Sequence, residues 1–183
     1  MNLLYEKFPD SVKLSGKDYP IYTDFKNWLK FFDMLEEPKF SEHEKMLLAL
    51  RWYQDRIEPE IWEEGIQALI RFAIRGDIPE QSRNKGSSKK ILSWSFDAPY
   101  IYAAFLSEYH IDLLNATMHW HLFLALFDAL PEDTPIKQRM YYRGINIGEI
   151  KDKNEKKRIL KIQRQIRIPQ EKLNAFEIGS AFG

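Results

Sequence analysis

The stretch FDAPYIYAAFLSEYHIDLLNATMHWHLFLALFDAL, residues 96–130, decides the fold because it concentrates aromatic side chains and carries little charge. Acidic residues and histidines interrupt it, so no apolar run approaches the roughly 20 residues that a membrane-spanning helix needs. Asp97 and Pro99 are typical of a helix start, and apolar residues then recur at helical spacing. We predict two antiparallel helices, 97–109 and 117–130, joined by a short turn and burying their aromatic faces against each other.

The same rings have a second interpretation, as the surface that binds a partner. Tyr100, Tyr102 and Tyr109 lie around the first predicted helix and cannot all face one core. A tyrosine at the edge of a core is a frequent interface residue, because its ring is apolar and its hydroxyl is polar. We therefore predict that these three tyrosines contact a partner. The other aromatic residues either fill the core or line a partner-binding groove, and the sequence leaves both roles open.

The chain upstream of this stretch predicts a hairpin followed by three helices. Residues 11–22 alternate apolar and polar side chains around a Ser-Gly turn, which indicates a short β-hairpin. Helix starts follow at Thr23-Asp24, at a capping box formed by Ser41 and Glu44, and at Pro59. We expect Met46, Leu47, Leu50 and Tyr53 to lie on the second of these helices, and the third to end at Gly76-Asp77.

Charge is unevenly distributed along the chain, although 27 basic and 27 acidic residues give a formal net charge of zero. Residues 1–77 carry net −4, and we predict that they form the hairpin and the first helices. Residues 78–90 carry net +3 and are rich in Ser, Gly and Lys, which predicts a flexible basic linker. Residues 91–150, net −4, form the aromatic helical hairpin and pack with the N-terminal part in one domain. Residues 151–183, net +5, form a basic helix and a tail.

The last predicted helix, residues 151–167, combines a narrow isoleucine stripe with a basic surface. We predict that Lys157, Lys161 and Arg164 bind a partner, and that the helix docks on an acidic surface of its own chain or of a neighbour. Nucleic-acid binding is the alternative, although no helix-turn-helix pattern precedes this segment. The fold predicted for the whole chain is mainly α, a multi-helix domain with a short N-terminal β-hairpin and a basic C-terminal helix.

The sequence contains no pattern that indicates catalysis. It lacks cysteine, nucleotide-binding glycine motifs and hydrolase motifs. His119 and His121 form an H-x-H pair, but on a helix two such side chains point roughly 200° apart, so no metal site is expected. The acidic pairs Glu36-Glu37 and Glu63-Glu64 are typical of solvated helix faces. We expect no enzyme, no catalytic residue, no cofactor and no metal, in a cytoplasmic protein without a signal peptide.

Three segments resemble one phage protein family. These are the start of the chain through residue 31, the segments FDAPYIYAAFLSEYHIDLL and MHWHLFLALFDAL, and YYRGINIGEIKDKNEKKRILKIQRQ. The family is encoded in the tail-gene region of temperate phages and prophages of Gram-positive bacteria, and it is named for the fifteenth gene product of one of them. The resemblance covers about residues 1–168 and is most specific in FDAPYIYAAFL.

The resemblance implies a tail-assembly chaperone, a small helical protein that coats the apolar, helical tape-measure protein until the tail tube assembles. The expected partners are tape-measure or other tail proteins and further copies of the chain, in the host bacterial cytoplasm. Neither a membrane nor nucleic acid is expected as a partner. The alternative is a phage nucleic-acid-associated regulatory protein that uses residues 151–167. The family has no established catalytic or ligand residues, so none is transferred to this sequence.

Overall fold

The structure is a computed structural model and describes residues 5–76 and 90–169. The predicted basic linker 78–90 therefore lies outside the described residues except for Lys90. The predicted tail likewise lies outside them from residue 170 onward.

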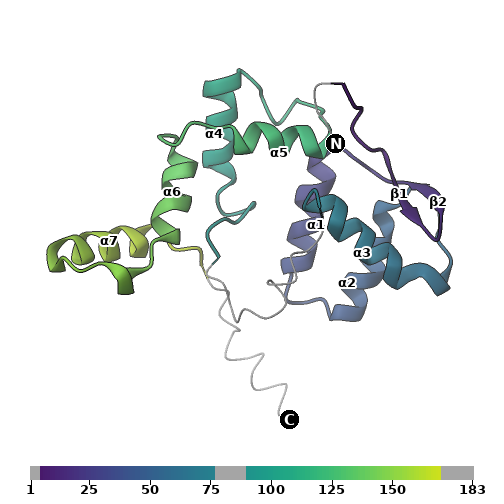
Figure 1. The fold of residues 1–183 in the computed structure, drawn as a ribbon, viewed down its shortest axis with the longest axis horizontal. Coiled ribbons are helices and arrows are strands. Elements are labelled where there is room, and N and C mark those ends of the chain that lie inside the picture. The colour runs from purple at the N-terminus through teal and green to yellow at the C-terminus, as the bar shows by residue number, and fades with distance from the viewer. Residues whose placement is uncertain (1–4, 77–89, 170–183) are drawn as a thin grey trace, which may run out of the picture.

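The described residues fold mainly into α-helices with one N-terminal β-hairpin, as the sequence predicted. In Figure 1 they form an arch, in which the hairpin and the first three helices make one side. The fourth, sixth and seventh helices make the other side, and the fifth lies across the top. The elements are β1 (Ser11–Leu14), β2 (Lys17–Pro20), α1 (Phe25–Glu36), α2 (Glu42–Ala49), α3 (Trp62–Ala73), α4 (Ala98–Tyr109), α5 (Trp120–Asp128), α6 (Pro135–Gly144) and α7 (Lys153–Gln165), with 3-10 turns at Leu50–Trp52, Pro59–Ile61 and Ile147–Glu149.

The β-hairpin is held against α3. Ser15 and Gly16 at its turn have φ of 47° and 85°, which is the left-handed backbone that a two-residue hairpin turn needs. The backbone N–H and the hydroxyl of Ser15 donate to the Glu64 carboxylate at 2.8 and 2.9 Å. Leu14 is fully buried. Since a lone two-stranded ribbon is only marginally stable, these contacts with α3 hold the hairpin in place.

Local helix signals upstream of residue 76 are largely confirmed. The Asp24 side chain caps α1, and Ser41 with Glu44 forms both hydrogen bonds of a capping box at α2. Pro59 begins a separate 3-10 turn, so α3 starts slightly later than predicted. At the far end of α3, Arg75 takes the left-handed conformation.

The second helix is shorter than predicted because its last apolar residue is used elsewhere. Tyr53 lies beyond the end of α2 and forms an isolated antiparallel bridge with Ile21. Its hydroxyl donates to the carbonyl oxygen of Gly65 at 2.9 Å. A Cβ at position 65 would lie only 2.8 Å from Ile57 Cδ1, so glycine permits this close approach.

The prediction of two antiparallel helices joined by a short turn is wrong. α5 begins at Trp120, later than predicted, and residues 110–119 separate it from α4. The residues just before α5 are extended and pair with the backbone that precedes α1. The Phe25 N–H donates to the Met118 carbonyl oxygen at 3.0 Å, and the Trp120 N–H donates to that of Thr23 at 2.7 Å. This pairing brings α5 against α1, and Figure 1 shows α5 crossing α4.

One aromatic core joins the two sides of the arch. Trp120 and Phe123 of α5 are fully buried. Trp120 lies 6.3 Å from Trp28 of α1, between ring centroids. Phe123 stacks at 5.0 Å on both Phe25 of α1 and Phe105 of α4. These rings of the 96–130 stretch therefore form core, and the groove described below lies beside it.

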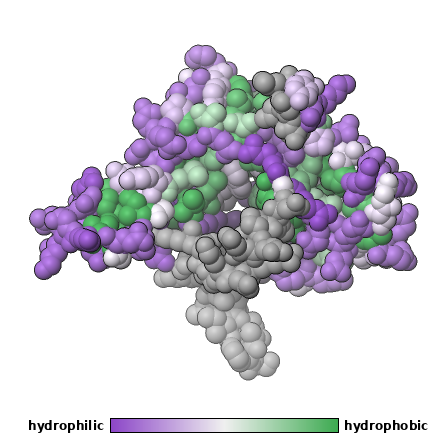
Figure 2. All heavy atoms as spheres, in the orientation of Figure 1, coloured by the Kyte–Doolittle hydropathy of each residue, from purple (hydrophilic) through white to green (hydrophobic). Residues whose placement is uncertain are grey.

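The helix α7 docks on α6 through its isoleucine stripe. Ile159 is buried, and the Gln163 side-chain amide donates to the carbonyl oxygens of Tyr142 and Ile145 at 2.8 and 2.9 Å. Figure 2 shows hydrophobic residues toward the middle of this face and over the α6–α7 side, with hydrophilic residues along the outer edge. Ile159 is thus covered within the chain, while Ile162 and Ile166 stay partly exposed.

Candidate functional site

An apolar groove of about 580 Å³ lies between α1 and α4. The α1 and α4 helices form its walls, and core rings from α5 and from the segment before α4 form its base. A volume of this size falls in the range of protein pockets that take a ligand or a few side chains of a partner. The groove is lined by Phe25, Lys26, Leu29, Lys30, Trp94, Ala98, Pro99, Ile101, Tyr102, Leu113, Leu114 and Phe123.

The rim of the groove is basic on one side and apolar on the other. Lys26 and Lys30 stand on the α1 wall, and Lys26 Nζ donates to the carbonyl oxygen of Leu114 at 2.9 Å. That bond ties the α4–α5 connection to α1. The Leu114 side chain is 74% exposed at the mouth of the groove. The arrangement can accept apolar side chains at its base and a negative charge beside Lys30.

Of the three predicted tyrosines, only Tyr102 lines this groove. Its hydroxyl donates to Asp112 at 3.1 Å, and this hydrogen bond, with burial and the carboxylate charge, raises the pKa of Tyr102. The Tyr109 hydroxyl donates to the Leu126 carbonyl oxygen at 2.8 Å, which links α4 to α5. The Tyr100 ring lies under the Arg139 guanidinium, 4.0 Å from its centroid. All three are half-buried, and their polar or ring surfaces already have intramolecular partners.

The three predicted basic residues lie on a different part of the molecule. Lys157, Lys161 and Arg164 are exposed on α7, and the structure places no groove residue on that helix. The sequence predicted docking of this helix on an acidic surface of its own chain or of a neighbour. Within the chain it docks on α6 through apolar and hydrogen-bonded contacts, and among the described residues these three cations form no ion pair. The predicted partner-binding residues therefore form two separate groups.

A buried ion pair holds α6, α7 and the start of α4 together. Asp97 was predicted to cap α4, but its side chain makes no capping bond and is fully buried. It accepts from Arg143 at 2.5 and 2.8 Å, and Arg139 approaches it at 3.4 Å. Arg143 also donates to the carbonyl oxygens of Ile91 and Ile166 at 2.9 and 2.7 Å. A buried carboxylate needs such charged partners, and this need overrides the local capping preference.

Burial alone would raise the pKa of Asp97. The hydrogen bonds from Arg143 and from the Ser93 backbone, with the charges of Arg143 and Arg139, outweigh that effect and hold the pKa below its ordinary value. The carboxylate is therefore ionised at neutral pH and acts as the centre of a fixed polar cluster.

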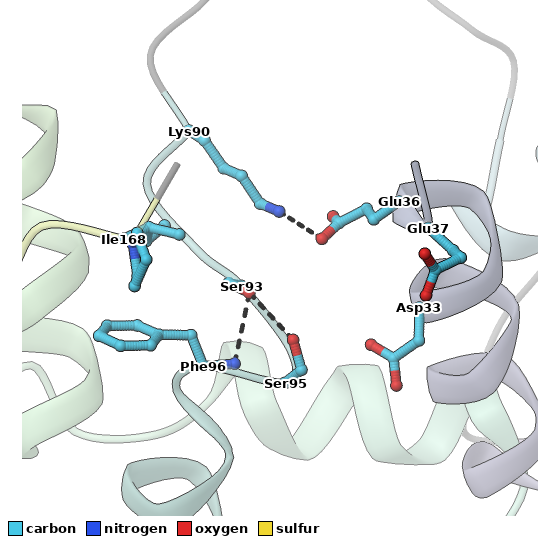
Figure 3. A pocket seen from close by; sticks show the side chains of 9 residues that line it. Asp33, Glu36, Glu37, Lys90, Ser93, Ser95, Phe96 and Ile168 are labelled. Carbon is cyan, nitrogen blue, oxygen red and sulfur yellow. Dashed lines mark hydrogen bonds and ion pairs between the residues drawn. The ribbon is translucent and has the colours of Figure 1, made fainter. Parts of the chain in front are cut away.

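A second cavity, of about 710 Å³, is lined mainly by charged residues and serines and lies where the two sides of the arch face each other. Figure 3 shows Asp33 and Glu36 of α1, with Glu37 just after it, on one side and Lys90 with Phe96 on the other. Lys90 Nζ lies 2.5 Å from the Glu36 carboxylate. The pKa of Asp33 is raised, first by burial and then by the charge of Glu36. The Lys90–Glu36 ion pair connects the two sides of this cavity. We therefore interpret the cavity as part of the interface between the two sides of the arch.

The H-x-H pair has a structural role in the described chain. His119 caps α5 by accepting the His121 backbone N–H at 3.0 Å, and its Nε2 lies 2.9 Å from the Pro9 carbonyl oxygen. His121 Nε2 lies 2.8 Å from the Phe72 carbonyl oxygen, while its Nδ1 is buried without a partner. A carbonyl oxygen requires a donor, so each ring carries a proton on Nε2. His119 is neutral because its Nδ1 accepts a hydrogen bond, and burial lowers the pKa of His121, whose Nδ1 has no acceptor, and so favours its neutral form. Each ring joins α5 to a segment far away in the sequence.

We expect the protein to lose stability as the pH falls from about 7.5 to about 5. Burial lowers the pKa of both His119 and His121, and the charges of His119 and Arg75 lower that of His121 further. The unfolded chain takes up protons near pH 6.5, before the folded one does, so the stabilisation is complete above about pH 6.5 and declines below it. Urea midpoints at the two pH values measure this decline.

The variant His121→Phe keeps the ring and removes the titration, so its midpoint should change less between the two pH values. His43, exposed on α2, provides the matched control His43→Gln, which should retain the wild-type difference. An unchanged pH dependence in His121→Phe would show that this ring is not the group responsible.

Metal binding and membrane crossing find no support in the part of the chain that the structure describes. Within residues 5–76 and 90–169, no three His, Asp or Glu side chains are grouped as metal ligands would be. In the same residues no helix is long and apolar enough to cross a bilayer.

Sequence reasoning left a groove open as one use of the aromatic residues but did not locate it, and it missed the buried ion pair. Leu114 and Lys30 carry no motif, since the groove forms only when α1 and α4 are brought together. Asp97 did carry a usable signal. It is a carboxylate inside an aromatic, charge-poor stretch, and such a residue needs a cation if it is buried. The sequence did not identify Arg143 as that cation.

Comparison with known proteins places the chain in a phage family. The model of the family described as Bacteriophage Gp15 protein matches residues 4–168, which include the hairpin, the seven α-helices that the structure describes and both walls of the groove. No match was found among the curated proteins or among the solved structures. The matched residues span most of the 183-residue chain, which therefore belongs to the bacteriophage Gp15 protein family.

Proposed function

We propose that this protein is a non-catalytic tail-assembly chaperone that acts in the host bacterial cytoplasm and binds the apolar, helical tape-measure protein. The observation that carries the proposal is the apolar groove between α1 and α4. A chaperone for amphipathic helices needs a concave apolar surface and no catalytic group. Membership of a phage family is consistent with such a partner.

The groove suits the apolar face of one helix. Helix-in-groove recognition uses side chains at positions i, i+3, i+4 and i+7, which lie on one face of the bound helix. Ile101 and Phe123 at the base are buried, while Leu29 and Tyr102 are partly exposed on the walls. A partner helix can therefore place large apolar side chains between the walls and bury their apolar surface against the existing core.

The lysines select among amphipathic partners. Lys26 is engaged with the Leu114 carbonyl oxygen, whereas Lys30 is exposed and forms no ion pair among the described residues. An acidic residue flanking the apolar stripe of the partner would meet Lys30. The proposed ligand is thus a helix with an apolar stripe and acidic residues on one flank.

We expect Leu114→Glu to weaken binding of a helical tape-measure fragment by about tenfold or more, which corresponds to about 1.4 kcal/mol. Leu114 is mostly exposed, so the variant should fold, while the new carboxylate would face the apolar surface of the ligand. Titration of a fluorescent fragment at two salt concentrations measures the effect.

The matched control is Leu47→Glu, which makes the same change at an exposed leucine of α2 outside the groove. It should bind like the wild type. Because the contact is mostly apolar, moderate salt should leave binding largely intact. Equal binding by Leu114→Glu and the wild type would exclude this groove as the binding site.

The second candidate is a phage nucleic-acid-associated regulatory protein, and the exposed basic surface of α7 favours it. Phosphate contacts would make the affinity for duplex DNA fall by orders of magnitude as salt rises. A protein that ignores the helical fragment but binds DNA with this salt dependence would replace the chaperone proposal with the regulatory one.

A further inference from the structure

The basic face of α7 is held in a fixed orientation. With about 100° per residue, Lys153, Lys157, Lys161 and Arg164 fall on one stripe, and Ile159 lies on the opposite side. Ile159 is buried against the rest of the chain, so the stripe must face outward. All four cations are exposed, and none of them forms an ion pair within the described residues.

Two contacts keep α7 in this position. Gln163 donates to two backbone carbonyl oxygens at the end of α6 and just beyond it. Arg143, itself paired with Asp97, donates to the Ile166 carbonyl oxygen at the end of α7. The stripe is therefore a fixed surface along about 16 Å of helix, from the 1.5 Å rise per residue.

An acidic surface of similar extent lies in the segment leading into α3. Residues 55–64 contain five carboxylates and one arginine, net −4. Asp55, Glu60 and Glu63 are exposed and have no ion-pair partner among the described residues, and Glu58 accepts only the Tyr19 hydroxyl, at 3.3 Å. Carboxylates at the start of a helix interact favourably with the helix dipole, but this interaction leaves their outer oxygens available to a partner.

The two charged surfaces lie at opposite ends of the molecule. In Figure 1 the longest axis is horizontal, with α7 at one end and the start of α3, preceded by the acidic segment, at the other. One copy cannot bring its own basic stripe onto its own acidic segment. The formal net charge of zero also means that approaching copies do not repel each other overall.

We infer that copies of this chain associate head to tail, with the basic stripe of α7 on one copy against the acidic segment 55–64 of the next. Such a contact joins two different surfaces and leaves one of each free, so it builds rings or open chains rather than closed pairs. Ile159 is already buried in its own chain and lies opposite the basic stripe, so charge holds the contact together. Salt weakens it accordingly.

A charge-exchange experiment tests this inference. The basic variant Lys157→Glu/Lys161→Glu and the acidic-segment variant Asp55→Lys/Glu60→Lys each change only exposed residues. In sedimentation velocity at about 20 mM salt, the average mass of the wild type should rise with concentration, and about 0.5 M salt should return it to that of the monomer. Each variant alone should remain monomeric, because its two substitutions reduce the net charge of the altered surface from +4 or −4 to zero.

Mixing the two variants should restore association in pairs only, since the unaltered basic stripe of the acidic-segment variant meets the unaltered acidic segment of the other variant. A chain with all four substitutions should stay monomeric even at low salt, and a wild-type circular dichroism spectrum would show that it still folds. A wild type that stays monomeric at low salt would overturn the inference, as would variants that associate like the wild type. A monomer whose α7 binds duplex DNA would assign the stripe to nucleic acid instead.

The two proposals fail separately. Fragment binding in the groove is measured by Leu114→Glu and should survive salt, whereas head-to-tail association is measured by charge exchange and should not. The Leu114→Glu variant should associate like the wild type, because Leu114 belongs to neither charged surface.

Discussion

Trp120→Ala should lower the free energy of unfolding by about 3–5 kcal/mol, the range found when a large buried ring is removed. The Trp120 ring is fully buried and lies within 6.3 Å of Trp28, Trp94 and Phe123, between centroids. Its Nε1–H donates to the Ala73 carbonyl oxygen at 2.9 Å, so truncation also leaves a buried acceptor without its donor. Urea denaturation monitored by circular dichroism measures the change.

Leu122 provides the control on the same helix. Its side chain is partly exposed, and Leu122→Ala should cost about 1 kcal/mol or less. Phe105→Ala removes another fully buried ring, on α4, and it should fall in the same range as Trp120→Ala. If both ring variants stayed within about 0.5 kcal/mol of the wild type, the rings would not form the core.

Arg143→Ala should also destabilise the protein by about 3–5 kcal/mol, because it leaves the fully buried Asp97 carboxylate without its main partner. It also removes the donor to the carbonyl oxygens of Ile91 and Ile166. A double-mutant cycle with Asp97→Ala measures the coupling between the two side chains. The double variant should be less destabilised than the sum of the single variants, since it leaves no unpaired charge.

An exposed pair of the same chemistry provides the control. Arg75 and Asp128 form an ion pair at the surface, where Asp128→Ala should change stability by about 1 kcal/mol or less. The depressed pKa of Asp97 adds a pH signature. Its stabilisation should be complete above about pH 4 and be lost as the pH falls further, and Asp97→Ala should remove that loss. Additive single-variant effects would argue against direct coupling of Asp97 and Arg143.

Signals contained within a few residues predicted their elements correctly. The Ser15-Gly16 turn and the Ser41–Glu44 capping box each depend on backbone and side chains that are neighbours in the sequence. The start of α5 depends instead on Thr23, whose carbonyl oxygen accepts the Trp120 N–H. Periodicity cannot detect such a partner, so the sequence predicts the start of α5 at residue 117, which is too early.

The candidate site was predicted less well than the fold, for the same reason. Tyr102 was identified because a tyrosine at the edge of an aromatic helix is recognisable from sequence. Lys30 and Leu114 were not, because they face one groove only after α1 and the α4–α5 connection meet. The basic stripe of α7 was readable from sequence, whereas its position at the opposite end of the molecule from residues 55–64 required the structure.

The pairing of the residues before α1 with those before α5 has a consequence during synthesis on the ribosome. The face of α1 that carries Trp28 meets Trp120, which is translated 92 residues later. At bacterial elongation rates this interval lasts roughly 5–20 s. For that time the emerging N-terminal segment lacks the surface that finally covers its rings. Co-translational folding therefore cannot complete this core helix by helix, and the part of the α1 face that meets Trp120 stays open to the cell's own folding factors until α5 has left the exit tunnel.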